Sequence, residues 1–318
     1  MKNLLKKTVL RITDLLVAPF TYLFMPVLKK IKFYGVEQFP LNRAAFKRTG
    51  VFPIRDHYYD PQFVYSSDFD FDKKRSLPFD FKVEEQLKRL GSLEHATELL
   101  QLPLDGTFGS GSFYLKNPSF SFGDADLYYL LIRNLKPKRI IEIGSGFSTL
   151  IAIEAIKKNK QEGYHTALTC IEPYEMPWLA QLKDVELIRQ KVELIDVSFF
   201  QSLEAGDFLF IDSSHIIRPE NDVLYEYLQL LPSLKKGVII HIHDIFSPRH
   251  YPKLWLHDFG RMWNEQYLLE AFLAFNTSFE VYFSLNLLKN DHYDQLSKVL
   301  LTLNREAAPG SFWMIKND

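Results

Sequence analysis

Short apolar runs recur along the second part of the chain, and more amphipathic stretches separate them. The runs cover residues 140–143, 167–171, 185–192, 207–212, 237–244, 279–288 and 311–315. Such runs, when charged residues or glycine bound them, are typical of strands buried in a parallel sheet. Helical spacing follows the first run, at Leu150, Ile151, Ile153 and Ile156. The alternation predicts an α/β fold with a doubly wound, Rossmann-like sheet of mostly parallel strands.

The first 32 residues form a basic and apolar arm. Its only acid is Asp14, whereas its basic residues are Lys2, Lys6, Lys7, Arg11, Lys29, Lys30 and Lys32. The apolar run 15–28 is too short to span a bilayer, and Pro19 and Pro26 predict a break in any helix there. No clean cleavage site for a secretory leader follows. The pattern indicates either a segment on an anionic membrane surface or an arm packed on the catalytic domain or a second subunit.

Residues 33–121 predict an irregular accessory region with one or two helices, for instance within 81–102, because aromatic, proline and charged residues follow no sustained period. Its segment His57-Tyr-Tyr-Asp60 suits a substrate lid, and equally an aromatic loop packed on the domain surface. A helical pattern from Asp124 leads into the first strand. We therefore expect three parts, 1–32, 33–121 and 122–318.

Composition narrows the class of protein further. A net charge of -1 gives no reason to expect nucleic acid as a partner. The single cysteine, Cys170, excludes an intramolecular disulfide and suits a reducing compartment. We expect a cytoplasmic protein, located at the membrane surface where the arm binds lipid. The sequence leaves a homo-oligomer open.

A glycine turn follows the first strand. Residues 142–149 read Glu-Ile-Gly-Ser-Gly-Phe-Ser-Thr. Gly144 and Gly146 allow the backbone to approach a ligand, and Ser148 and Thr149 can cap the next helix. The free N–H groups at the start of a helix favour anionic or hydroxyl oxygens. A dinucleotide fingerprint would need a third glycine, where this chain has Thr149.

Polar side chains stand at the ends of four predicted strands. They are Glu142 before the glycine turn, Glu172, the segment Asp212–His215, and the pair His243-Asp244. The carboxyl ends of parallel strands meet at one edge of a sheet, where ligands bind. Glu172 lies some thirty residues beyond the turn, a position from which an acid can accept both hydroxyls of a ribose. These residues predict a nucleotide-like ligand site at this edge.

From about Phe122 onward the chain resembles class I S-adenosylmethionine-dependent methyltransferases, in the branch of small-molecule and sugar O-methyltransferases. The resemblance rests on the glycine turn and on Ile-Glu-Pro, Phe-Ile-Asp-Ser-Ser-His, His-Ile-His-Asp-Ile-Phe and Trp-Asn-Glu-Gln-Tyr-Leu-Leu. It implies a seven-stranded sheet whose last strand is antiparallel, and S-adenosylmethionine as cofactor. The implied cofactor-binding residues are Glu142, Gly144, Ser145, Gly146, Ser148, Thr149, Glu172, Gln190 and Asp212.

Transfer to a hydroxyl requires that its proton be removed. His215, three residues beyond Asp212, is our candidate for the base, with Asp212 and Asp244 as further catalytic residues. Alternatively a divalent cation lowers the pKa of the hydroxyl. The resemblance to metal-dependent O-methyltransferases points to Asp212, His243 and Asp244 as its ligands. Because His243 stands where those enzymes have a carboxylate, a transition metal suits this set better than Mg²⁺.

The function expected is therefore O-methylation of a small-molecule or glycan-related hydroxyl. Trp255 and Trp263 suit a sugar-like acceptor, although a tryptophan in such a position is often part of the core. Two other interpretations stay open. One is an NAD-linked oxidoreductase on the same fold, and the other is a membrane-attached binding protein without catalysis.

Overall fold

The computed structural model describes residues 2–174 and 176–318, and its chain divides into two units. The first unit runs to Phe69 and includes Gly260–Met262, and the second consists of Asp70–Phe259 and Trp263–Asp318. Residues 70–121, which we assigned to an accessory region, therefore pack with the sheet. The division into an arm, an accessory region and a catalytic domain, with boundaries after residues 32 and 121, stays a prediction.

The first unit contains one long helix, α1 (Lys2–Tyr34), followed by a short 3-10 helix (Val36–Gln38) and α2 (Pro40–Thr49). The predicted break at Pro19 and Pro26 is wrong, because both prolines lie inside α1. A proline removes one backbone hydrogen bond, which a helix with good formers on both sides survives, usually with a bend. Within the described residues, the part Leu5–Tyr34 is long and apolar enough to cross a membrane by length and composition.

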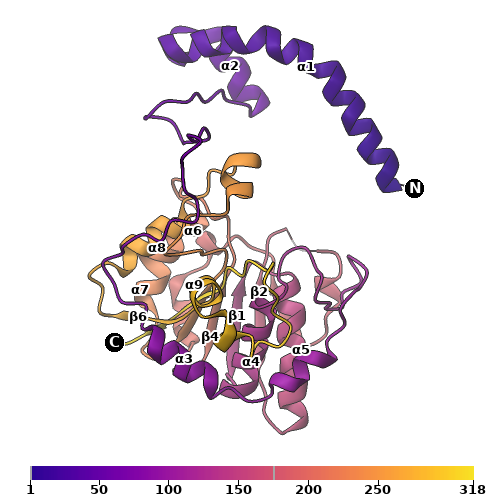
Figure 1. The fold of residues 1–318 in the computed structure, drawn as a ribbon, viewed down its shortest axis with the longest axis vertical. Helices are drawn as coiled ribbons and strands as arrows, with labels where there is room; N and C mark the ends of the chain where they lie inside the picture. Colours follow the sequence, from indigo (N-terminus) through magenta and orange to yellow (C-terminus); the bar gives the residue numbers. More distant parts are fainter. Residues whose placement is uncertain (1, 175) are drawn as a thin grey trace. The chain divides into compact units, whose positions relative to one another are not determined.

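The second unit is built on the sheet that Figure 1 shows at the centre of the lower part of the ribbon. Its strands are β1 (Arg139–Ile143), β2 (Ala167–Ile171), β3 (Val185–Ile188), β4 (Phe208–Ile211), β5 (Ile239–Ile242), β6 (Phe279–Ser284) and β7 (Phe312–Lys316). They lie in the order β3-β2-β1-β4-β5-β7-β6. The strands β1 to β5 pair in parallel, whereas β7 is antiparallel to both β5 and β6. The predicted fold class is confirmed.

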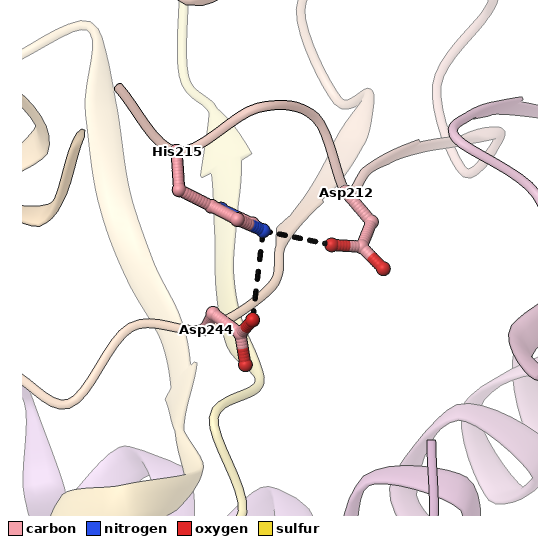
Figure 2. A group of neighbouring side chains, drawn as sticks. All are labelled: Asp212, His215 and Asp244. Carbon is pink, nitrogen blue, oxygen red and sulfur yellow. Dashed lines mark ion pairs between the residues drawn. The ribbon is translucent and has the colours of Figure 1, made fainter. Parts of the chain in front are cut away.

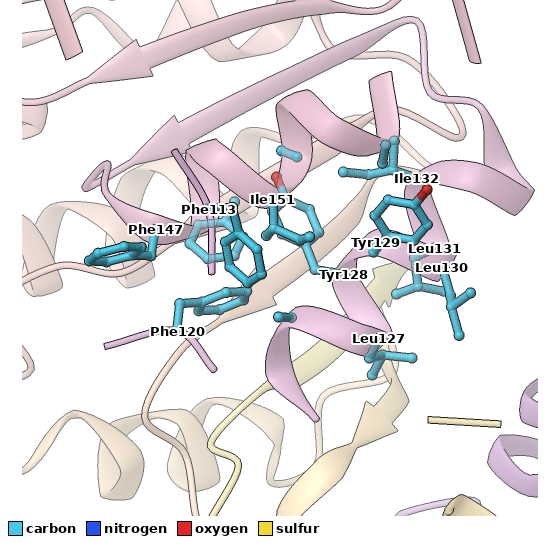
Figure 3. Close-up of a cluster of buried hydrophobic side chains, with 14 of the residues drawn as sticks. Phe113, Phe120, Leu127, Tyr128, Tyr129, Leu130, Leu131, Ile132, Phe147 and Ile151 are labelled. Atoms are coloured by element: carbon cyan, nitrogen blue, oxygen red, sulfur yellow. The ribbon is translucent and has the colours of Figure 1, made fainter. Parts of the chain in front are cut away.

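Helices cover both faces of this sheet, and alternate strand residues supply the two cores. On one face Ile140 and Phe210 pack with the helices α4 (Asp124–Leu135) and α5 (Phe147–Gln161). Figure 3 shows the centre of this core, where Tyr128 of α4 lies among Phe113, Phe120 and Ile151. The next residues along the strands, such as Ile141 and Ile211, belong to the core of the other face. The period of two along each strand thus places one set of side chains on each side.

The remaining elements are short. They are α3 (Val83–Gly91), α6 (Asp222–Tyr225), α7 (Leu231–Ser233), α8 (Glu265–Leu273), α9 (Leu285–Asp291), α10 (Tyr293–Leu296), π-helices over Glu226–Leu230 and Leu254–Asp258, and 3-10 helices over Ala96–Gln101, Leu179–Gln181, Val192–Leu194 and Val197–Ser202. Several bounds differ from the sequence pattern. The third strand ends at Ile188 rather than at residue 192, and the sixth ends at Ser284 rather than at residue 288.

A buried arginine joins α4 to its surroundings. The Arg133 side chain is 1% exposed, and its Nε and Nη2 donate to the two carboxylate oxygens of Glu98 at 2.8 and 3.0 Å. Nη2 also contacts Glu162 at 2.5 Å, and Nη1 donates to Asn159. Removal of the cation leaves the half-buried Glu98 and the buried Asn159 without this partner.

We expect Arg133→Ala to lower the free energy of unfolding by about 3 kcal/mol, in the range found when one partner of a buried ion pair is lost. Chemical denaturation of the two proteins measures the difference. Arg305→Ala is the matched control, because the pair of Arg305 with Asp294 is 71% and 83% exposed. Such a surface pair contributes about 0.5 kcal/mol or less. Equal losses in the two variants would show that Arg133 has no special structural role.

Candidate active site

Backbone hydrogen bonds bring the predicted strand ends together. The N–H of Gly144 donates to the Ile171 carbonyl at 3.0 Å, so the glycine turn lies beside the end of β2. The N–H of Asp212 donates to the Ile143 carbonyl at 2.8 Å, which places the end of β4 on the other side of the turn. The N–H of His243 donates to Ile211 at 2.9 Å. The ends of β1, β2, β4 and β5 therefore form one edge, as the sequence predicts.

A cavity of about 300 Å³ opens at this edge. Gly144, Glu172, Lys191, Asp212 and Ser213 are among the residues that line it. Three of these, Gly144, Glu172 and Asp212, belong to the predicted cofactor-binding set. Pockets of this size with a few convergent polar groups are typical of ligand sites.

Gly144 is the point of closest backbone approach in the turn. Its φ is +77°, and a Cβ placed there would lie 2.0 Å from the backbone oxygen of Asp212. Only glycine meets both conditions, since other residues rarely adopt this φ and have no space for a side chain. Gly146 differs, because a Cβ at this position would meet no atom within 4 Å. Gly144 thus allows the turn after β1 to approach the backbone at the end of β4, whereas the space beside Gly146 is free of protein atoms.

The start of α5 is capped from inside the helix. The N–H of Gly146 donates to Thr149 Oγ1 at 3.1 Å. Ser148 and Thr149 are both buried. The expected cap by a hydroxyl is therefore made by Thr149, three residues beyond the N-cap position.

Glu172 holds the turn and faces the cavity. Its Oε2 accepts the N–H of Ser145 at 3.2 Å, and its Oε1 accepts the N–H of Tyr174 at 2.7 Å. The carboxylate is therefore oriented by two backbone donors from different loops. The role predicted for it, to bind a ribose, stays a prediction.

Glu142 does not line the cavity but lies behind the turn. Tyr128 donates to its Oε1 at 3.1 Å, and Thr149 Oγ1 donates to its Oε2 at 2.5 Å. Burial raises the pKa of this carboxyl from its ordinary value of 4.5 to about 7, although the hydrogen bonds of Thr149 and Tyr128 oppose the change. Glu142 thus positions the cap of α5 in this structure, and a role in holding the cofactor would act through Thr149.

This raised pKa predicts a pH effect on stability. Between pH 4.5 and about 7 the folded protein keeps a proton on Glu142 that the unfolded chain has lost. The stability that the group contributes is complete below pH 4.5 and falls as the pH rises to about 7. Relative to Glu142→Gln, the wild type should lose on the order of 3 kcal/mol across this interval. Denaturation of both proteins at pH 5 and pH 8 tests this, and parallel curves would contradict it.

The other predicted cofactor residues are not among those that line the cavity. The side-chain amide of Gln190 donates to the Leu194 carbonyl at 3.0 Å, whereas the neighbouring Lys191 faces the cavity. Ser145 contributes its backbone N–H to Glu172, and its buried hydroxyl has no hydrogen-bond partner. Their contacts with a cofactor remain predictions.

Beside the cavity His215 lies between two carboxylates, as Figure 2 shows. Its Nε2 is 3.2 Å from Asp212 Oδ1 and 3.5 Å from Asp244 Oδ2. Its Nδ1 is 2.9 Å from Glu265 Oε2, at the start of α8. His215 and Asp244 both have positive φ, 59° and 57°. Non-glycine residues in this conformation are uncommon and cluster at functional sites, where surrounding contacts hold them.

The carboxylates control the charge of this cluster. Burial lowers the pKa of His215, but the hydrogen bonds to Asp212 and Glu265 outweigh it and raise that pKa to about 10. Burial raises the pKa of Asp212, yet the charges and hydrogen bonds of His243 and His215 hold it below its ordinary value. His215 is therefore an imidazolium at neutral pH. To act as a base it must first give up the Nε2 proton.

His243 occupies a second position among the same acids. Its Nδ1 is 3.6 Å from Asp212 Oδ1 and 3.5 Å from Asp244 Oδ1, and its Nε2 is 3.6 Å from Asp124 Oδ2. Burial opposes protonation, but the Asp244 and Asp212 charges raise the pKa of His243 well above its ordinary value. The predicted ligand set was Asp212, His243 and Asp244. The group whose ligand atoms all lie within 4.8 Å of one another has His215 in place of His243.

Some contributors were not identified from the sequence. Asp124 begins α4 and reaches His243 across more than a hundred residues of chain. Glu265 was named only within the motif Trp-Asn-Glu-Gln-Tyr-Leu-Leu, whereas in the structure its carboxylate orients the ring of His215. Trp263 and Trp255 were named as candidates for acceptor contacts, but not the contact of the Trp263 ring with that of His215 at 4.4 Å between ring centroids. A local sequence motif does not predict these contacts, because they depend on how α4 and α8 pack on the sheet.

Comparison with known proteins agrees with this fold. Residues 141–245 match the family model described as a methyltransferase domain. An uncharacterised protein of Archaeoglobus fulgidus is 38% identical over 133 residues, which are 40% of this chain and 59% of that protein. The chain thus matches less than two thirds of the relative's length. Residues 141–245 are thus similar to a methyltransferase domain, and the order of the strands agrees with the seven-stranded sheet that the sequence resemblance implied.

Several solved structures resemble parts of the chain. The O-methyltransferase TomG of Streptomyces achromogenes has 14% identity and a TM-score of 0.37, with coverage of 76% of this chain and 92% of that one. An O-methyltransferase of Bacillus cereus has 16% identity, a TM-score of 0.36 and coverage of 76% and 92%. An N1-methyltransferase of Burkholderia thailandensis has 13% identity, a TM-score of 0.34 and coverage of 78% and 93%. At TM-scores this low the similarities carry no argument about the present chain.

Proposed function

We propose that the protein transfers the methyl group of S-adenosylmethionine to a hydroxyl of a small-molecule or glycan-related acceptor. One observation carries the proposal. Asp212 lines the cavity beside the glycine turn and also contacts His215 at 3.2 Å, so a donor pocket and a cluster able to take a proton share this residue. A hydroxyl bound at the cluster would lie next to a sulfonium bound in the cavity.

The reaction needs one proton transfer and one displacement. Once the His215 imidazolium has released its Nε2 proton to solvent, the acceptor oxygen gives its own proton to His215 and forms a bond to the methyl carbon, while the bond from that carbon to sulfur breaks. The electron pair stays on sulfur, which becomes the neutral thioether of S-adenosylhomocysteine. Positioning of donor and acceptor in line supplies a large share of such catalysis. Removal of the proton by a placed side chain supplies the rest.

The same cluster fits a divalent cation. Asp212, His215 and Asp244 would hold it, because two carboxylate oxygens and one imidazole nitrogen already converge there. When bound, such an ion lowers the pKa of the acceptor hydroxyl. A mixed nitrogen and oxygen set suits a transition metal better than Mg²⁺. Chelator-treated enzyme should then regain activity with Mn²⁺ or Zn²⁺ rather than with Mg²⁺. Full activity after chelation would exclude the ion from the mechanism.

An aromatic wall beside the cluster supports a flat or sugar-like acceptor. Trp263 lies against His215, and Trp255 lies 5.2 Å from Trp263 between ring centroids. Aromatic faces contact the apolar side of a ring well, while the polar groups around His215 would contact its hydroxyls.

Two measurements test the proposed function. Calorimetry should show binding of S-adenosylhomocysteine and none of NAD, since the turn lacks the third glycine. Incubation with labelled S-adenosylmethionine and panels of glycans, phenols and amines should then label a hydroxyl compound. Binding of NAD would favour the oxidoreductase. Labelling of amines alone would replace O-methylation by N-methylation, and cofactor binding without turnover on any panel would favour a binding protein.

A further inference from the structure

The helix α1 carries two opposed stripes along its length. One stripe, with a residue at every third or fourth position, consists of Lys7, Arg11, Asp14, Ala18, Thr21, Met25, Lys29 and Lys32. The opposite stripe is apolar and consists of Leu5, Val9, Ile12, Leu16, Phe20, Leu23 and Val27. Residues three or four apart lie on the same side of a helix. The helix is therefore amphipathic toward its two ends, whereas over residues 15–28 the opposed stripe carries no charge.

The described chain does not cover the apolar side. Every member of the apolar stripe is between 52% and 68% exposed. Phe24, which belongs to neither stripe, and Met25 of the opposite stripe are 56% and 51% exposed. Soluble proteins rarely leave a contiguous apolar surface of this extent in water, and such surfaces mark sites of contact with a membrane or a partner.

The charges on α1 identify the partner. Basic residues stand at both ends, with Lys6, Lys7 and Arg11 before the apolar part and Lys29 and Lys30 after it. Lys32 belongs to the same end and pairs with Asp60 of the same unit at 2.7 Å. We propose that α1 lies in the plane of an anionic phospholipid bilayer, with its apolar stripe in the headgroup region and both basic ends on the lipid phosphates.

The arrangement of charge favours this position over a helix that spans the bilayer. Although Leu5–Tyr34 is long and apolar enough to cross a membrane, its uncharged part, residues 15–28, is about 21 Å long at 1.5 Å per residue, so a spanning helix would place charged residues inside a hydrocarbon core of about 30 Å. A spanning helix would also send one basic cluster to each side, although basic residues gather on the cytoplasmic side. In the plane, both clusters contact the same anionic surface.

The experiment uses the full-length protein and sedimentation with vesicles. One set of vesicles is pure phosphatidylcholine, and the other contains about one third phosphatidylglycerol, enough for a negative surface potential. The protein should bind the anionic vesicles at least tenfold more tightly. Lys7→Ala, Arg11→Ala and Lys29→Ala should each weaken binding roughly fivefold, the equivalent of about 1 kcal/mol per basic residue at a membrane surface.

Variants of the apolar stripe test the other half of the proposal. Leu16→Glu and Phe20→Glu should each weaken binding to anionic vesicles at least tenfold, because a buried leucine or phenylalanine contributes about 1.5–3 kcal/mol. Leu41→Glu in α2 is the matched control, since Leu41 is 85% exposed and lies outside α1. It should bind as the wild type does. Thermal unfolding of each variant confirms that the fold is retained.

Three results would overturn the proposal. Equal binding to neutral and anionic vesicles would remove the role of lipid charge. Retention in the membrane after an alkaline carbonate wash would show a spanning helix, because a helix in the plane is released. Self-association that Leu16→Glu abolishes, without vesicle binding, would show that a second copy covers the stripe. None of these readouts depends on methyl transfer, so the proposed reaction stands or falls separately.

Discussion

Replacement of His215 by asparagine is expected to lower turnover by about 100- to 10,000-fold, the range that one general acid or base contributes. The affinity for S-adenosylhomocysteine should change by less than about threefold, since an interaction made only in the transition state affects turnover rather than ground-state binding. The side chain lies beside the donor cavity but is not one of the groups that line it. Initial rates at saturating donor and calorimetry with S-adenosylhomocysteine give the two quantities.

Asparagine is chosen because it tolerates the positive φ of 59° at this position better than alanine does. A loss of activity then reports the missing imidazole rather than a strained backbone. His257→Ala is the matched control, since His257 is 46% exposed and pairs with Asp258 away from the cluster. Unchanged turnover in His215→Asn would remove His215 from the mechanism. A parallel loss of cofactor affinity would instead assign it to the binding of the donor.

Gly144→Ala is expected to abolish measurable binding of S-adenosylhomocysteine, with a loss of at least about 100-fold in affinity, because the turn that shapes the cavity cannot keep its position. The new Cβ would lie 2.0 Å from the Asp212 oxygen, so β1 and β4 would have to separate. The left-handed backbone adds about 1–2 kcal/mol of strain. Calorimetry and thermal unfolding measure the two effects.

Two further glycines separate these causes. Gly163 has a φ of +88°, and a Cβ placed there would meet no atom within 4 Å. Gly163→Ala therefore introduces the same kind of backbone strain as Gly144→Ala without its close contact. It should lose a little stability and keep full affinity. Gly146→Arg introduces a side chain where a Cβ meets nothing within 4 Å, so it should fold normally and obstruct the donor. Normal binding in both Gly144→Ala and Gly146→Arg would show that the donor does not occupy this turn.

The sequence was sufficient for the sheet and for the edge that carries the site. The second strand was predicted over 167–171 and has these bounds, because a short apolar run between polar loops is typical of a buried strand. The antiparallel final strand was expected from the resemblance and is confirmed by its pairing with β5. Position at the end of a parallel strand also brought Glu172, Asp212 and Asp244 to one edge.

The direction of individual side chains was not available from the sequence. Glu142 turns away from the cavity because Tyr128 and Thr149 offer it hydrogen bonds behind the turn. Both His215 and His243 lie between the two aspartates, but the compact group of possible ligands contains His215, which has a positive φ, as Asp244 has. Local pattern says nothing about either choice. We did not predict α1 as a single helix, because we expected Pro19 and Pro26 to end it, as a proline inside a helix usually does.

The position of β7 bears on how the protein reaches its folded state. This strand comes last in the chain but lies inside the sheet, between β5 and β6. Until residues 312–316 arrive, β5 presents unpaired N–H and C=O groups and the apolar residues Ile239, Ile240 and Ile242 along an open margin. Such margins pair readily with other chains. Refolding from denaturant should therefore be slow, because pairing between strands far apart in the sequence generally slows folding. At high protein concentration the unpaired margin should also lead to aggregation.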